Sequence, residues 1–160
     1  MCGITGIFNY RSEKETSSEQ VVKKMLSMIH HRGPDESGVY LDKNLGIGSV
    51  RLSIVDLSSG QQPMCDDSGR YWIVYNGEIF NFPELKIDLQ KKGIRFRTNC
   101  DTEIVVQMYA YYGEGCLQQF NGQFAFCIWD KYKRELFLAR DRVLVFGKQV
   151  GQRRAQVHGF

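Results

Sequence analysis

The sequence lacks any apolar run that approaches the roughly 20 residues of a membrane-spanning helix. Its N-terminus also lacks the basic start and apolar stretch of a secretory signal peptide. These two absences predict a cytoplasmic protein that does not contact a membrane. The 160 residues include ten Phe and eight Tyr, which is enough for a single folded domain with a real core.

The five cysteines include no CxxC pair, and their odd number and spacing fit reduced thiols better than a disulfide framework or a zinc site. His30 and His31 adjoin each other and are not at ligand spacing. We therefore expect no metal site. Four cysteines are expected to serve as packing residues: Cys65, Cys100, Cys116 and Cys127.

The net charge of +3 does not indicate a nucleic-acid partner, because it is confined to one end of the chain. Residues 143–160 contain Lys148, Arg153 and Arg154 and no acid, so the preceding residues are neutral in sum. A neutral body with a basic tail lacks the basic face of a nucleic-acid-binding protein.

Cys2 directly follows Met1. A small second residue allows removal of the initiator methionine, which would leave Cys2 with a thiol and a free α-amine on the same residue. An α-amine titrates at a pKa near ~8, close enough to working pH to accept the thiol proton. Cys2 is therefore a candidate nucleophile that carries its own base.

Hydrophobic periodicity predicts two or three helices and about seven strands, in an order typical of a two-sheet sandwich covered by helices. Helices are expected over 17–31, with a Ser17–Gln20 capping box, over the segment from Asn81 to Gly93, and over 102–112. The clearest strands are expected over 4–8, 45–52, 71–75, 124–129 and 135–139.

Polar groups in or beside these elements suggest a binding site. Asn76 and Gly77 follow a predicted strand and could supply an amide and a backbone N–H to an oxyanion, or could form a hairpin turn. Arg51 interrupts an apolar strand, so its guanidinium requires either a substrate carboxylate or a structural salt bridge. Asp101 could accept a substrate ammonium or could be a helix N-cap. The segment 30–35 is interpreted as architecture.

Several of these motifs strongly resemble those of the glutaminase domain of asparagine synthetase, a glutamine amidotransferase with an N-terminal cysteine. The resemblance extends over residues 2 to about 142. It is carried, in order, by Met-Cys-Gly-Ile-Thr-Gly-Ile-Phe at 1–8, His-Arg-Gly-Pro-Asp-Glu-Ser-Gly at 31–38, Arg-Leu-Ser-Ile-Val-Asp at 51–56, Tyr-Asn-Gly-Glu-Ile-Phe-Asn at 75–81, Asn-Cys-Asp-Thr-Glu at 99–103 and Phe-Asn-Gly-Gln-Phe-Ala-Phe at 120–126.

The resemblance implies an α+β fold, the four-layer αββα sandwich of the N-terminal-nucleophile hydrolases, with two antiparallel sheets between helical layers. It also implies that L-glutamine is hydrolysed to glutamate and ammonia through a γ-glutamyl thioester on Cys2. The implied substrate and oxyanion contacts are Arg51 for the α-carboxylate, Asp101 for the α-amine, Asn76 and Gly77 for the oxyanion, and Leu52, Ile54, Val55 and Glu78 along the pocket.

The resemblance ends after Arg142, where the family continues with Gly and then Lys-Pro-Leu-Tyr but this chain has Val143-Leu-Val-Phe. We therefore expect a glutaminase domain over 1–142 and a divergent, partly disordered tail over 143–160, in which Val143–Phe146 could still pair as a strand. The sequence contains no Ser-Gly-Gly-x-Asp-Ser pyrophosphate loop. ATP, magnesium and the synthetase partner domain thus belong to the family's full-length parent. The alternative is a catalytically silent, truncated glutamine-binding domain.

Overall fold

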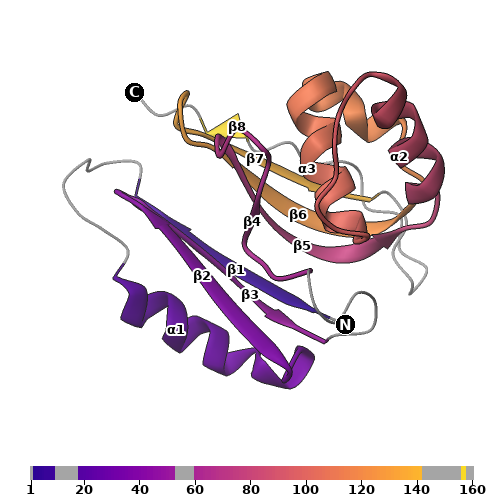
Figure 1. Ribbon diagram of the computed structural model, residues 1–160. Coiled ribbons are helices and arrows are strands. Elements are labelled where there is room, and N and C mark those ends of the chain that lie inside the picture. The colour runs from indigo at the N-terminus through magenta and orange to yellow at the C-terminus, as the bar shows by residue number, and fades with distance from the viewer. Residues whose placement is uncertain (1, 10–17, 53–59, 142–155, 158–160) are drawn as a thin grey trace.

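The computed structural model describes residues 2–9, 18–52, 60–141 and 156–157. In this part of the chain, two antiparallel sheets face each other (Figure 1). Helix α1 (Glu19–Met28) covers the outer face of one sheet, and helices α2 (Phe82–Lys91) and α3 (Asp101–Tyr112) lie over the other (Figure 1). The layers therefore follow the predicted order of helix, sheet, sheet and helix.

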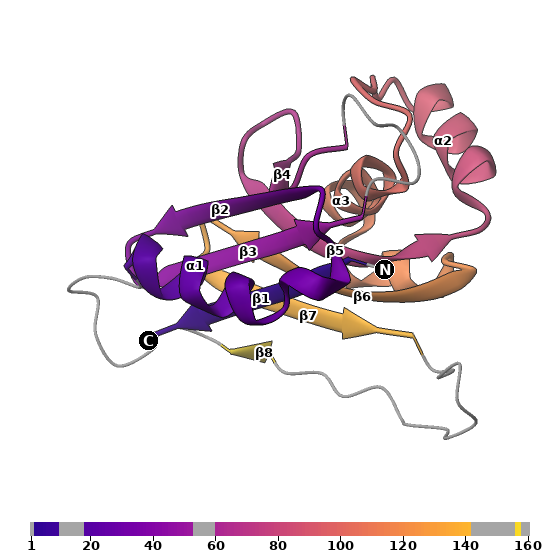
Figure 2. The ribbon, with the colours of Figure 1, turned by 90° about the horizontal axis from the view of Figure 1, so that it is seen from below.

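The first sheet contains β1 (Gly3–Phe8), β2 (Glu36–Asp42) and β3 (Leu45–Arg51), in the order β1-β3-β2. Figure 2 shows α1 crossing this sheet from the outside. Every residue of β3 is buried, because β3 is the central strand and has α1 on one face and the second sheet on the other. The predicted strands at 4–8 and 45–52 are thus confirmed.

Helix α1 differs from its prediction at both ends. Its N-cap is Ser18, whose side chain accepts a hydrogen bond from the Val21 N–H at 3.2 Å, whereas Ser17 lies outside the described residues. The predicted cap was therefore one residue too early. The α-helix ends at Met28, and a short 3₁₀ helix, η1 (His30–Arg32), continues the chain. Apolar periodicity alone does not distinguish the two helix types near a terminus.

The second sheet contains β4 (Met64–Cys65), β5 (Tyr71–Ile79), β6 (Gly122–Asp130), β7 (Glu135–Arg140) and β8 (Gln156–Val157), paired in sequence order. Strand β5 continues four residues beyond its predicted end, because it pairs with β6 as far as Ile79, which lies opposite Gly122. Asn76 and Gly77 are therefore inside a strand. The hairpin-turn alternative is wrong, because β6, which pairs here, is distant in the sequence.

The ends of the two helices over the second sheet lie within two residues of the predicted ones, but the cap of α2 differs from its prediction. Asn81 precedes α2 as expected, but its side chain does not cap the helix. It donates to the Gln119 carbonyl and accepts from the Asn121 N–H, both at 2.9 Å. Gly113 follows α3 with a φ of +58°, a conformation that favours glycine, and begins the 3₁₀ helix η2 (Gly113–Gln118).

Three apolar clusters among the described residues hold these layers together. The largest lies between the second sheet and its helices, another lies between the sheets around Leu45, Ile47 and Trp129, and a third joins α1 to the first sheet. The Trp129 Nε1 donates to Asp42 Oδ2 at 2.7 Å and links the sheets directly. Burial of this many large side chains is the main source of stability for a domain of this size.

The C-terminal segment is described only in part. Gln156 and Val157 pair with Phe137 and Leu136 of β7, within the stretch for which the sequence predicts disorder. The predicted strand at 143–146 lies outside the described residues. No helix among the described segments is long and apolar enough to span a membrane.

Candidate active site

A cavity of about 600 Å³ lies beside the N-terminal end of β1 and the start of α3. Its walls combine segments that are distant in sequence, among them the residue before β1, the end of β3, the middle of β5, the start of α3, the start of β6 and the end of β7. The structure brings together all the predicted site residues that it describes: Cys2, Arg51, Leu52, Asn76, Gly77, Glu78 and Asp101. Ile54 and Val55 lie outside the described residues.

The segment 30–35 positions Cys2 and the end of β3. Arg32 Nε donates to the Cys2 carbonyl at 3.1 Å. Gly33 packs so closely on β3 that a Cβ at this position would lie 2.6 Å from the Arg51 backbone, which explains why a glycine is needed. Pro34 forms an isolated bridge with Arg51. This segment therefore fastens the two strand ends that carry Cys2 and Arg51.

Arg51 has a protein partner as well as a place on the cavity wall. The residue is 7% exposed, and its Nη1 donates to Glu36 Oε2 at 3.0 Å. The guanidinium also packs on Gly60, where a Cβ would lie 2.5 Å from Nη2. Both sequence interpretations of Arg51 are thus compatible with the geometry, since the salt bridge exists and the side chain lines the cavity.

Strand β5 presents its uncovered edge to the cavity. The Tyr75 N–H donates to Gln62 Oε1 at 2.7 Å, and the Ile79 N–H donates to Asp101 Oδ2 at 3.2 Å. Because N–H directions alternate along a strand, the Gly77 N–H must project from the same edge, between these two bonds. A Cβ on Gly77 would lie 2.3 Å from the Gln123 carbonyl oxygen, so only glycine fits so close to β6.

Asp101 is the first residue of α3, and the N-cap position belongs to Cys100. Its Oδ2 accepts hydrogen bonds from the Tyr75 hydroxyl at 2.7 Å and from the Ile79 N–H at 3.2 Å. The N-cap interpretation of Asp101 is therefore wrong. Burial raises the pKa of the Asp101 carboxyl, and the two hydrogen bonds oppose that rise because they favour the anion.

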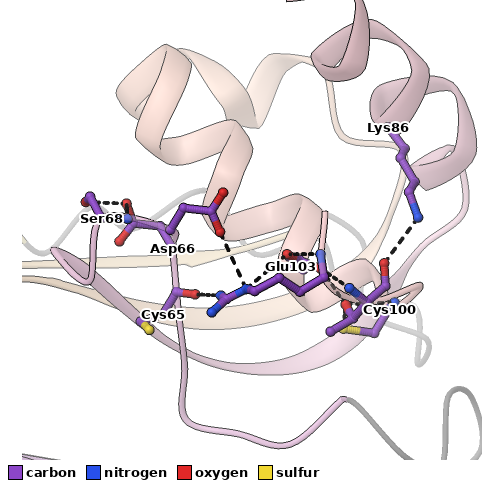
Figure 3. Close-up of polar contacts among 9 residues, drawn as sticks. Cys65, Asp66, Ser68, Lys86, Cys100 and Glu103 are labelled. Atoms are coloured by element: carbon purple, nitrogen blue, oxygen red, sulfur yellow. Dashed lines mark hydrogen bonds and ion pairs between the residues drawn. The ribbon is translucent and has the colours of Figure 1, made fainter. Parts of the chain in front are cut away.

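A buried carboxylate holds the loop before α3 (Figure 3). Glu103 is fully buried, and its Oε2 accepts from the Thr98 N–H at 2.7 Å and from the Thr98 hydroxyl at 2.6 Å. The Thr98 oxygen also lies 3.1 Å from Cys100 Sγ. Lys86 of α2 donates to the Thr98 carbonyl at 3.1 Å. These bonds give the segment one conformation and so determine where Asp101 begins the helix.

Sequence reasoning missed several residues of the cavity wall. Gln62 Nε2 donates to Thr102 Oγ1 at 3.2 Å, so Gln62 connects the edge of β5 to the start of α3. Tyr75 and Arg140 also line the cavity. Gln62 lies in a polar loop and Tyr75 in an apolar strand, so neither has a local signal of function. Arg140 lies near Asn76 because Ala125 of β6 pairs with both residues. This proximity could be predicted only from the pairing of the three strands.

Comparisons with known proteins agree with this geometry. The family model described as a glutamine amidotransferase domain matches residues 1–150. The chain belongs to the glutamine amidotransferase family. It is 43% identical over 142 residues to a glutamine-hydrolyzing asparagine synthetase of Bacillus subtilis (strain 168) and 32% identical over 154 residues to asparagine synthetase B of Escherichia coli (strain K12).

Those alignments include 88% and 94% of this chain, which spans 22% and 27% of the two relatives' lengths. Among solved structures, the glutamine phosphoribosylpyrophosphate amidotransferase from B. subtilis superimposes with a TM-score of 0.70 at 21% identity, covering 87% of this chain and 37% of that one. This likeness establishes the fold. The glutamine amidotransferase domain is an α+β sandwich of two antiparallel sheets between helical layers.

Proposed function

We propose that this domain hydrolyses L-glutamine to glutamate and ammonia, with Cys2 as the nucleophile. The observation that supports the proposal best is that one cavity is lined by all of these residues: Cys2, Arg51, Asp101, Asn76 and Gly77. An amino acid with an amide side chain matches this set, because it offers a carboxylate, an ammonium and an electrophilic carbon.

Recognition of the α-carbon groups is assigned to two opposite charges. The Arg51 guanidinium would bind the α-carboxylate, because its planar donors match a carboxylate. The Asp101 carboxylate would accept hydrogen bonds from the α-ammonium. Leu52 and Glu78, which also line the cavity, would contact the substrate's chain. These assignments need no metal or other cofactor.

The chemistry begins after removal of Met1. The α-amine of Cys2 takes the thiol proton, directly or through a water, and the thiolate attacks the side-chain amide carbon. The developing oxyanion accepts hydrogen bonds from the Asn76 amide and the Gly77 N–H. Collapse of this tetrahedral intermediate breaks the C–N bond, and the ammonium of Cys2 returns its proton to the departing amide nitrogen, which leaves as ammonia. Water then hydrolyses the thioester and releases glutamate.

The relatives suggest a larger setting for this reaction. Their names describe them as glutamine-hydrolyzing asparagine synthetases, and this chain spans about a quarter of their lengths. We propose that the domain supplies ammonia to a synthetase domain of a full-length parent, in the cytoplasm, where its five free cysteines would remain reduced. On its own it would lose the ammonia to solvent.

Two measurements on the 160-residue protein test this function. Its intact mass, with and without an electrophilic glutamine analogue, reports removal of Met1 and alkylation at Cys2. Incubation with glutamine, aspartate and ATP–magnesium should yield glutamate at a rate that does not depend on ATP, and no asparagine. Glutamine binding without glutamate release would instead support the alternative of a catalytically silent domain. Asparagine formation by residues 1–160 would contradict the proposal that a separate synthetase domain carries out that step.

A further inference from the structure

The Tyr75 hydroxyl stands between the two ends of the proposed glutamine site. It donates to Asp101 Oδ2 at 2.7 Å, and it is also close enough to Cys2 for the two groups to interact electrostatically. Tyr75 is 2% exposed, and its backbone N–H is held by Gln62. Its ring therefore cannot turn away from Asp101 without displacing the core of the second sheet.

We infer that Tyr75 is a positioning residue that holds the Asp101 carboxylate in the orientation that receives the substrate's α-ammonium. The inference rests on the proposed function and adds a specificity role for a residue that does not itself take part in the reaction. The Tyr75 hydroxyl and the Ile79 N–H donate to the same oxygen of Asp101, Oδ2. They restrict the rotation of the carboxylate about its last bond.

The same hydrogen bond favours the charged form of Asp101. Burial raises the pKa of the Asp101 carboxyl, whereas the bond from Tyr75 lowers it by stabilising the anion. Burial, followed by the proximity of Asp101, raises the pKa of Tyr75 well above its ordinary value, so the hydroxyl remains a donor across the working range. An ionised carboxylate attracts an ammonium far more strongly than a neutral carboxyl does.

Other titratable groups around Asp101 do not replace this donor. Glu103 lies on the same helix, but its carboxylate is turned to Thr98 and the Arg97 N–H. Burial raises the pKa of the Cys100 thiol, so that thiol stays neutral. The remaining charged or ionisable side chains of the cavity wall come from β1, β3, β5 and β7 and their ends: Cys2, Arg51, Glu78, Arg140 and Asp141.

The test measures glutamine binding by calorimetry between pH 4 and 8, in a Cys2→Ala background that prevents turnover. Tyr75→Phe should weaken binding about tenfold at neutral pH, as loss of one hydrogen bond to a charged group implies. It should also move the acid limb of the binding curve upward, because an Asp101 with a higher pKa is protonated at a higher pH. Tyr109→Phe is the matched control, since it removes the hydroxyl of another partly buried tyrosine, which lies near the C-terminal end of α3 and does not line the cavity, and it should change neither quantity.

Two further variants separate positioning from general damage. Asp101→Asn should abolish the acid limb of the binding curve. In the Asp101→Asn background, Tyr75→Phe should have no added effect on glutamine binding. This absence of an added effect is expected even if Tyr75→Phe alone lowers the melting temperature. In the Cys2-containing protein, Tyr75→Phe should raise KM and leave kcat within about twofold.

An unchanged acid limb in Tyr75→Phe, or additive effects of the two substitutions, would overturn the inference while leaving the glutaminase proposal standing. If the Cys2→Ala protein with Tyr75 intact fails to bind glutamine at any pH, both proposals fail.

Discussion

Arg51 Nη1 donates to Glu36 Oε2 at 3.0 Å, so the guanidinium proposed to bind a substrate carboxylate is already paired with a carboxylate of the protein. The pair is asymmetric, because the Arg51 side chain is nearly buried whereas that of Glu36 is 32% exposed. This arrangement lets Glu36 orient the guanidinium without enclosing it. It also means that a stability role and a binding role for Arg51 must be separated by experiment.

Arg51→Lys should raise KM for glutamine about ten- to a hundredfold and leave kcat nearly unchanged. Lysine keeps the charge but loses the planar fork, and hydrogen bonds to charged groups contribute roughly 1.5–3 kcal/mol. Glu36→Gln is the matched variant, since it weakens the ion pair and retains the fork. It should lower the melting temperature and change KM only a few-fold. Steady-state kinetics and thermal melts of both variants distinguish the binding role from the stability role. An unchanged KM in Arg51→Lys would mean that Arg51 has only a structural role.

Glutaminase activity should require Cys2 at the amino terminus. A non-cleavable extension before Cys2 converts its α-amine into an amide, which cannot accept the thiol proton at working pH. The extended protein and Cys2→Ala should each release no glutamate above background and should melt at the parent's temperature. Glutamate release by an extended protein, at the rate of the processed one, would refute the terminal-amine mechanism.

Asn76→Ala should depress kcat, in contrast to Arg51→Lys. Removal of one oxyanion donor costs about 3 kcal/mol of transition-state stabilisation, equivalent to a loss of roughly two orders of magnitude in kcat. Glutamine binding, measured in the Cys2→Ala background, should remain within a few-fold of the parent's. A variant that bound glutamine weakly but turned it over normally would move Asn76 from the oxyanion site to substrate recognition.

Gly77→Ala should destabilise the fold, because the new Cβ would lie 2.3 Å from the Gln123 carbonyl oxygen and 2.6 Å from the Phe124 Cα. Backbone atoms cannot yield as a flexible side chain can, so we expect a loss of at least about 2 kcal/mol in the free energy of unfolding. Gly115→Ala is the control, since no atom lies within 4 Å of its added Cβ, and its effect should stay within about 0.5 kcal/mol. Urea denaturation of both variants provides the measurement.

Brief alkylation of the native protein at pH 8 should label Cys2 and Cys65 and spare the other three cysteines. Burial raises the pKa of Cys116 and of Cys127 to about 12 and also raises that of Cys100, so these thiols hold their protons at pH 8. Cys2 and Cys65 are only partly buried. Peptide mapping by mass spectrometry shows which sites react, with the urea-unfolded protein as the fully labelled control. Fast labelling of Cys127 would contradict its placement between the sheets.

Sequence patterns predicted helices and strands well where interactions between neighbouring residues are sufficient to form them. The helix before Gly113 and the strand Gly3–Phe8 follow from side-chain periodicity and backbone preference, which act within a few residues. The same reasoning misplaced the cap of α1 by one residue and ended β5 too early. The cap of α1 is a local contact, in which Ser18 accepts from the Val21 N–H, whereas the end of β5 depends on its pairing with β6, more than forty residues further along the chain.

The candidate site divides in the same way. The sequence alone determined which chemical groups are available: a thiol next to the amino terminus, an Asn-Gly pair, an arginine in an apolar strand and an aspartate at the start of a helix. Only the tertiary structure decided that these groups line one cavity, that Arg51 is paired with Glu36, and that the Tyr75 hydroxyl is directed at Asp101. The physical reason is that each of these contacts joins segments whose separation is set by sheet register and helix packing, and these depend on burial of the whole core.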